Sequence, residues 1–172
     1  MIKELISFED LVKDKYFKIP DYQRGYSWEH NQLVDLLKDI EHTSKGNHKH
    51  YSGTVVLAFN NSKRYDIVDG QQRITSLIIL LNVIEQSFPG RFPEIQSNFL
   101  IRNDEYVLET NLETNTYFKE AIIGARGNYP LEIKSISNLK LAKEHLTEWV
   151  LEHQASIDLL YETVVKKLGF SK

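Results

Sequence analysis

A strand that runs directly into a long apolar helix constrains the fold of this chain more than any other sequence feature. Residues 64–68 read as a buried strand, and an Asp-Gly turn follows them at once. A helical pattern begins behind the glycine and ends at the Pro-Gly pair at 89–90. Its inward positions are Ile74, Leu77, Ile78, Leu81, Ile84 and Phe88. This junction predicts that strands and helices share one core.

A hairpin precedes the junction. Residues 51–59 are a second strand candidate, and Asn60, Asn61 and Ser62 between two strands are typical of a turn. The further elements that the pattern predicts are a helix over 7–15 with Ser7 as its N-cap, a strand over 16–19, a helix from 27 onward, a small hairpin over 99–102 and 106–108 that turns at Asn103 and Asp104, and helices over 113–123, 138–153 and 156–168.

These elements predict an α+β (mixed α/β) fold in two parts, with a boundary near Asn111. Residues 1–110 would form the α/β part, and residues 111–172 a helical extension packed on it. Because apolar residues continue to Phe170, we expect the chain to be the N-terminal part of a longer protein.

Composition sets outer limits on the class of protein. A hydrophobic content of 41% in 172 residues excludes disorder as the main description. The longest apolar stretch, 78–84, is far shorter than the roughly 20 residues that a membrane-spanning helix needs. There is no cysteine, and the N-terminus lacks the features of a signal peptide. We therefore expect a cytoplasmic protein with no membrane partner.

Charge is unevenly distributed along the chain. The net charge is −3, yet five basic residues face two acidic ones between 42 and 73. Between 85 and 162 there are seven basic and thirteen acidic residues. The first half is therefore where an anionic ligand would bind, although lysines near 45–49 are equally typical of a solvated loop.

Residues 19–28, which we call the aromatic loop, are one candidate site. Tyr22 and Tyr26 flank Gln23 and Arg24 in a segment between a strand end and a helix start. The tyrosines could stack on a nucleobase, while Gln23 and Arg24 could bond a phosphate or a base edge. The alternative is that the aromatic residues pack in the core and Gly25 only turns the chain.

Residues 69–73, the DGQQR turn, are the second candidate. Asp69 and Gln72 have the spacing of a capping box, which would give both a structural role. That reading leaves Arg73 unexplained, because a cation in the first turn opposes the helix dipole unless an anion is bound there. Gly70 lets the backbone approach such an anion. Asp69 could instead bind a divalent metal ion or orient a water molecule.

Both segments carry a family resemblance. Ile-Pro-x-Tyr-Gln-Arg-x-Tyr-x-Trp at 19–28, Leu-Leu-x-Asp-Ile at 36–40, His-Tyr-x-Gly at 50–53 and Val-Asp-Gly-Gln-Gln-Arg-x-Thr at 68–75 closely resemble the N-terminal domain of GmrSD-type, modification-dependent restriction systems. The likeness is strongest over 17–81, and 111–118 and 137–142 are similar to its weaker later blocks. The resemblance implies a ParB/sulfiredoxin-like fold, a small β-sheet with flanking helices.

The resemblance also implies that the chain binds and hydrolyses a nucleoside triphosphate (NTP), with Mg²⁺ as a possible cofactor. It would act as the regulatory or sensor domain of a phage-defence restriction system that acts on modified double-stranded DNA. A nuclease domain would lie in the same longer chain or in a partner subunit. No P-loop motif occurs, so an NTP would be held without that phosphate cradle.

The site residues that we expect follow from these two segments. The catalytic set is Asp69, Gln72 and Arg73, with Asp69 as a possible Mg²⁺ ligand; the phosphate-binding set is Gly70, Gln71, Arg73, Thr75, Gln23 and Arg24; and Tyr22 and Tyr26 would contact the DNA base. Two other functions fit the same residues: a DNA-binding module without hydrolysis, and a domain whose aromatic loop docks a partner protein.

Overall fold

A computed structural model describes residues 4–60, 63–127, 129 and 132–172. The elements in chain order are β1 (Ile6–Ser7), α1 (Phe8–Val12), β2 (Phe17–Lys18), α2 (His30–Ser44), β3 (His50–Thr54), β4 (Val56–Phe59), β5 (Tyr65–Asp69), α3 (Gln71–Ser87), η1 (Gln96–Leu100), β6 (Ile101–Arg102), β7 (Glu105–Tyr106), β8 (Leu108–Glu109), α4 (Asn115–Tyr117), η2 (Phe118–Ile123), α5 (Lys134–Glu152), η3 (Gln154–Ser156), α6 (Ile157–Glu162), η4 (Thr163–Lys167) and β9 (Leu168–Ser171). The α+β class is confirmed, while the ParB/sulfiredoxin-like fold and the division at residue 110 stay predictions.

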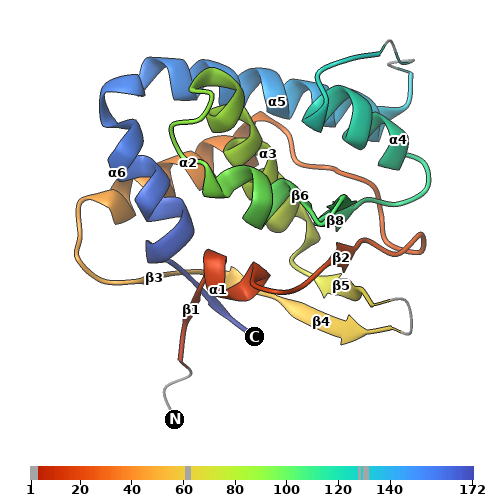
Figure 1. Ribbon diagram of the computed structural model, residues 1–172, viewed down its shortest axis with the longest axis horizontal. Coiled ribbons are helices and arrows are strands. Elements are labelled where there is room, and N and C mark those ends of the chain that lie inside the picture. The colour runs from red at the N-terminus through yellow and green to blue at the C-terminus, as the bar shows by residue number, and fades with distance from the viewer. Residues whose placement is uncertain (1–3, 61–62, 128, 130–131) are drawn as a thin grey trace.

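Short strands form two main sheets. One has the order β1-β9-β3, in which β9 is antiparallel to β1 and parallel to β3. The other has the order β4-β5-β2-β8, with an antiparallel β4/β5 pair and parallel β5/β2 and β2/β8 pairs. The longer helices α2, α3, α5 and α6 lie on one side of these strands (Figure 1).

Helix α3 lies at the centre of the helical layer. Every side chain from 74 to 84 is buried, so the helix is covered on all sides and not only on the face that the apolar spacing predicted. It packs against α5, η1 and η2. Its buried amide Asn82 donates to the carbonyl of Ile122 at 2.8 Å, which satisfies a polar group inside the core. The C-terminal half of α3 is thereby joined to η2.

The prediction of one continuous strand over 51–59 is wrong, because this segment forms two strands. It divides at Val55 into β3 and β4, which belong to different sheets. Val55 is buried, and its amide donates to the carbonyl of Ser171 at 2.9 Å. The hairpin prediction itself is confirmed by the antiparallel pairing of β4 with β5. Within its predicted turn, Asn61 and Ser62 lie outside the described residues.

The strand β9 was not predicted. All four of its residues are buried, so the alternation that marks a half-buried strand is absent from this part of the sequence. The helix predicted over 156–168 is observed as η3, α6 and η4, and the apolar residues that follow it form the central strand of a sheet.

Other local predictions are confirmed. Ser7 is the N-cap of α1, and its hydroxyl accepts from the amide of Asp10 at 3.2 Å. Asn103 and Asp104 both have positive φ angles, 52° and 64°, as the tight turn between β6 and β7 requires. Among the described residues, none of the helices has the length and apolar character needed to cross a membrane.

Candidate functional site

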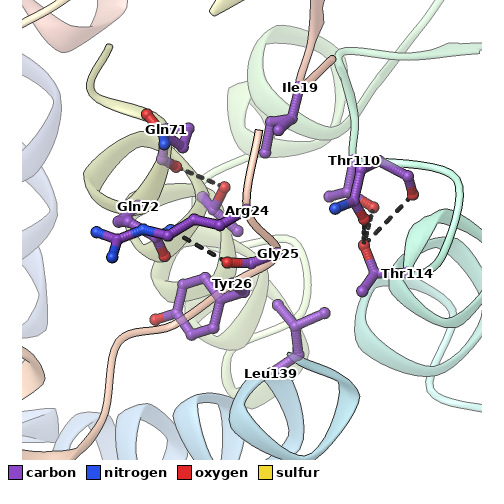
Figure 2. A pocket seen from close by; sticks show the side chains of 11 residues that line it. Ile19, Arg24, Gly25, Tyr26, Gln71, Gln72, Thr110, Thr114 and Leu139 are labelled. Carbon is purple, nitrogen blue, oxygen red and sulfur yellow. Dashed lines mark hydrogen bonds between the residues drawn. The ribbon is translucent and has the colours of Figure 1, made fainter. Parts of the chain in front are cut away.

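The side-chain amide of Gln72 joins the aromatic loop to the first turn of α3. Its Oε1 accepts from the amide of Ser27 at 2.9 Å, and its Nε2 donates to the carbonyl of Gly25 at 3.3 Å. Figure 2 shows this second bond between the helix and the facing loop. Because Gln72 is buried and both ends of its amide bond to the loop, its side chain positions the loop against α3.

A second bridge joins the same two segments. Gln23 Nε2 donates to the carbonyl of Val68 at 3.2 Å, at the end of β5. Gln71 Nε2 donates in turn to Gln23 Oε1 at 3.3 Å. The two sequence motifs are therefore in direct contact, as a single phosphate-binding set drawn from both of them requires. Unlike Gln72, Gln23 and Gln71 are only partly buried, and each keeps polar capacity for a ligand.

The DGQQR turn does not form the capping box that its spacing allowed. The N-cap of α3 is Gly70, with a φ angle of 95°, and no side chain caps the helix. A Cβ at this position would lie 3.1 Å from the carbonyl oxygen of Thr54, which explains why glycine is needed. Asp69 instead accepts from the amide of Gly70 at 2.9 Å. The positive end of α3 is thus left without a side-chain cap.

Arg73 reaches from this first turn to strand β3. Its guanidinium donates to Ser52 Oγ at 3.1 Å and lies 5.5 Å from the centre of the Trp28 ring, a cation–π arrangement. A Cβ at Gly53 would come within 3.4 Å of Arg73 Nε, so the guanidinium passes close to the backbone there.

The charge of Arg73 is not matched by a contacting acid. Burial lowers the pKa of Arg73, and the fields of Asp39 and Tyr51 oppose that effect only in part. Within the part of the chain that the structure describes, no carboxylate forms an ion pair with it. A half-buried guanidinium remains charged, so the site holds a positive charge that no described carboxylate contacts.

Asp21, Tyr22 and Arg24 are exposed members of the aromatic loop. Arg24 lines a small recess together with Gln71 and Gln72, as Figure 2 shows. No described residue forms an ion pair with it. Tyr22 is 76% exposed, so its ring is free to stack on a partner. The loop therefore presents one cation, one aromatic ring and the carboxylate of Asp21, which accepts from the amide of Leu112 at 2.8 Å.

Two of the predicted ligand contacts are corrected by burial. Tyr26 is 7% exposed, and its hydroxyl lies 2.7 Å from Ser76 Oγ; the same burial raises the pKa of the phenol. It packs in the core and cannot stack on a base. Thr75 is buried too, and its hydroxyl donates to the carbonyl of Gln71 at 2.7 Å, so that its proton is not available to a phosphate.

Three further residues belong to the recess and were missed as site residues. Thr110, Asn111 and Thr114 line its other side, where the Thr114 hydroxyl contacts Asn111 Oδ1 at 2.7 Å. Their only sequence signal was the weak later block of the family resemblance, because a polar cluster that follows a two-residue strand has no characteristic spacing. Ser52 was also missed, because it occupies the variable position of the His-Tyr-x-Gly motif at 50–53.

Asp69 is the one predicted metal ligand. It is exposed at the end of β5. Among the described residues, no three His, Cys, Asp or Glu side chains form a group that could hold a metal ion. A divalent ion at Asp69 would therefore need water or phosphate oxygens to complete its coordination, which is how Mg²⁺ is commonly bound beside nucleotides.

Comparison with known families agrees with this arrangement of motifs. Residues 3–170 match the model of the GmrSD restriction endonuclease N-terminal domain. The chain belongs to this family. A GmrSD N-terminal domain is a component of a restriction system that acts on modified DNA. The match confirms the resemblance and, at the level of the family, DNA as a partner. No curated protein gives a significant match to the chain.

We predict that Gln72→Ala in this GmrSD N-terminal domain detaches the aromatic loop from α3. The change leaves the amide of Ser27 and the carbonyl of Gly25 without their partner, at a cost of about 1–3 kcal/mol in the free energy of unfolding. Hydrogen exchange at the Ser27 amide should become faster. Gln71→Ala is the matched control, because the Gln71 side chain bonds to the Gln23 side chain and not to the Ser27 amide or the Gly25 carbonyl. Unchanged protection of Ser27 in Gln72→Ala would contradict the bridge.

Proposed function

We propose that this GmrSD N-terminal domain binds a nucleoside triphosphate at the first turn of α3. The observation that carries the proposal is Arg73: a half-buried guanidinium at the uncapped positive end of a helix, with no carboxylate in contact among the described residues. Such a charge is costly unless an anion accompanies it. A phosphate group is the anion best suited to a helix N-terminus and a guanidinium together.

The groups around Arg73 support phosphates rather than a single carboxylate. The amides of Gln71, Gln72 and Arg73 open the helix and lack a side-chain cap. Gln71 and Gln23 add side-chain amides, and Arg24 adds a second cation beside them. Several donors and two cations suit a ligand with several negative charges, such as the triphosphate of a nucleotide.

Hydrolysis of the bound NTP is the second part of the proposal. Asp69 is the carboxylate of the DGQQR turn, and its exposed position would let it meet the phosphates. If Mg²⁺ is bound, Asp69 would hold it together with phosphate oxygens, and the ion would neutralise charge that develops on them. Gln72 acts as a positioning residue, since both ends of its amide are engaged.

In the restriction system, nucleotide binding would regulate DNA cleavage. The DGQQR turn and the aromatic loop are held together by Gln72 and Gln23, so an occupied phosphate site would also fix Tyr22 and Arg24 on the outer face of the loop. Tyr22 is the candidate contact to a DNA base. A nuclease domain in the same longer chain or in a partner subunit would supply the cleavage.

We predict that Arg73→Ala lowers NTP affinity at least 10-fold, since hydrogen bonds to a charged group contribute about 1.5–3 kcal/mol. Isothermal titration with each NTP, with and without Mg²⁺, measures the effect. The melting temperature should change by no more than about 4 °C, corresponding to about 1 kcal/mol, because an unpaired half-buried charge adds little to stability. Arg91→Ala is the matched control, since Arg91 forms an exposed pair with Asp158.

Equal NTP affinity of Arg73→Ala and the unaltered chain would show that the phosphates bind elsewhere. Binding of duplex DNA but of no NTP by the unaltered chain would favour the DNA-binding module instead.

We predict that Asp69→Asn abolishes Mg²⁺-dependent NTP hydrolysis and leaves Mg²⁺-free NTP binding nearly unchanged. The asparagine oxygen can still accept from the amide of Gly70, so the turn is preserved while the charge is lost. Phosphate release measures the rate. Asp104→Asn in the exposed turn between β6 and β7 is the control, because asparagine suits its φ angle of 64°. An unchanged hydrolysis rate in Asp69→Asn would remove Asp69 from the catalytic set.

A further inference from the structure

We propose that a basic surface formed by Lys45, Lys49, Lys166 and Lys167 binds the phosphate backbone of duplex DNA. The proposal rests on the restriction-system part of the proposed function, in which DNA is the partner, and does not depend on nucleotide binding at Arg73. These lysines form two pairs that lie more than 100 residues apart in the chain. One pair is on the segment between α2 and β3, and the other is on η4. The fold brings them to one face.

Contacts between the two segments define this face. Lys167 Nζ donates to the carbonyl of Gly46 at 3.2 Å, which places the end of η4 against the segment that follows α2. Directly after η4, Leu168 pairs with His50 in the register of β9 and β3. Lys49 Nζ donates to the carbonyl of Leu5 at 3.4 Å. Leu5 directly precedes β1, the strand at the opposite edge of the same sheet. In Figure 1 the segment from α2 to β3 curves round the molecule beneath α6.

Little negative charge balances this surface. Lys45, Lys49 and Lys166 are exposed, and none of the four lysines forms an ion pair with a described carboxylate. Two acidic residues lie near these segments. Asp39 Oδ1 lies 4.0 Å from His50 Nε2, and Glu4 precedes Leu5 in the chain. In a chain of net charge −3, four lysines gathered from two segments are a local field that attracts a polyanion.

The type of residue indicates phosphate contacts and not base reading. Lysine is a flexible point charge that suits phosphates, whereas base edges are read by rigid forks such as arginine, asparagine and glutamine. The surface would therefore hold DNA without regard to sequence or base modification, and recognition of the modified base would lie elsewhere on the molecule.

Strand β3 connects Lys49 with the candidate nucleotide site along the chain. Lys49 precedes this strand, and Ser52, which accepts from Arg73, lies within it. At about 3.3 Å per residue, Lys49 and Ser52 are about 10 Å apart along the chain. DNA on the lysines would thus lie next to the first turn of α3.

The test is the combined variant Lys45→Ala, Lys49→Ala and Lys167→Ala in the full chain. Fluorescence anisotropy with a short labelled duplex, unmodified and modified, measures affinity between about 50 and 200 mM KCl, without NTP and with it. Each lost phosphate contact should reduce the slope of log affinity against log salt by about 0.9, so the slope should fall by up to about 3. At low salt the affinity should fall at least 10-fold for both duplexes.

A matched control removes the same charge elsewhere. The combined variant Arg126→Ala, Lys134→Ala and Lys140→Ala changes exposed cations of other segments, two of them paired with Glu29 and Glu144. It should leave the salt slope nearly unchanged. An unaltered slope in the first variant, an equal loss in the control, or no duplex binding by the unaltered chain would overturn the proposal. Because the readings without NTP stand alone, failure of the nucleotide site would not be mistaken for failure of this surface.

Discussion

The side-chain amide of Gln72 is the interaction on which the candidate site depends. It is buried between the aromatic loop and α3 and satisfies one backbone donor and one backbone acceptor of that loop at once. Without it, the loop would have two unpaired polar groups next to an apolar core, which is costly. The loop must therefore lie against the first turn of α3, and Gln23, Arg24 and Gln71 come together as a consequence. Gly70 makes the close approach of the turn to β3 possible.

Arg73 gives this scaffold its chemical character. The side chain connects the uncapped end of α3 with Ser52 on β3 and with the face of Trp28, and none of these neighbours is an anion. The same strand β3 leads to the four lysines of the basic surface. One edge strand thus links a site suited to phosphates of a nucleotide with a surface suited to phosphates of DNA, which gives the restriction component a short physical path between its two proposed partners.

The sequence predicted those parts of the structure that have local causes. The strand–turn–helix junction, the Ser7 cap and the turn at Asn103 and Asp104 follow from residue type and spacing, and all three are observed. The sequence could not predict that 51–59 divides between two sheets or that β9 enters the centre of one of them. Both depend on pairing between segments more than 100 residues apart, which leaves no periodic signal.

The candidate site shows the same limit. The expected phosphate-binding set draws on both motifs, and the structure brings these motifs into contact, but it gives Gln72 and Tyr26 structural partners. Gln72 and Tyr26 are functional candidates in the sequence because each lies within two residues of an arginine. In the structure, their polar atoms bond to Ser27, Gly25 and Ser76. Only burial and hydrogen-bond partners separate a residue that binds from a residue that positions. Arg73 and Arg24 form no ion pair with a carboxylate among the described residues and remain the candidates for binding.

The most direct measurement of the central claim is the change in backbone amide chemical shifts when an NTP is titrated into the chain. If the phosphates bind at the first turn of α3, the largest changes should fall on the amides of Gln71, Gln72 and Arg73 and on the side-chain amides of Gln23 and Gln71. Saturable changes confined to other parts of the chain, with these amides unmoved, would contradict the assignment.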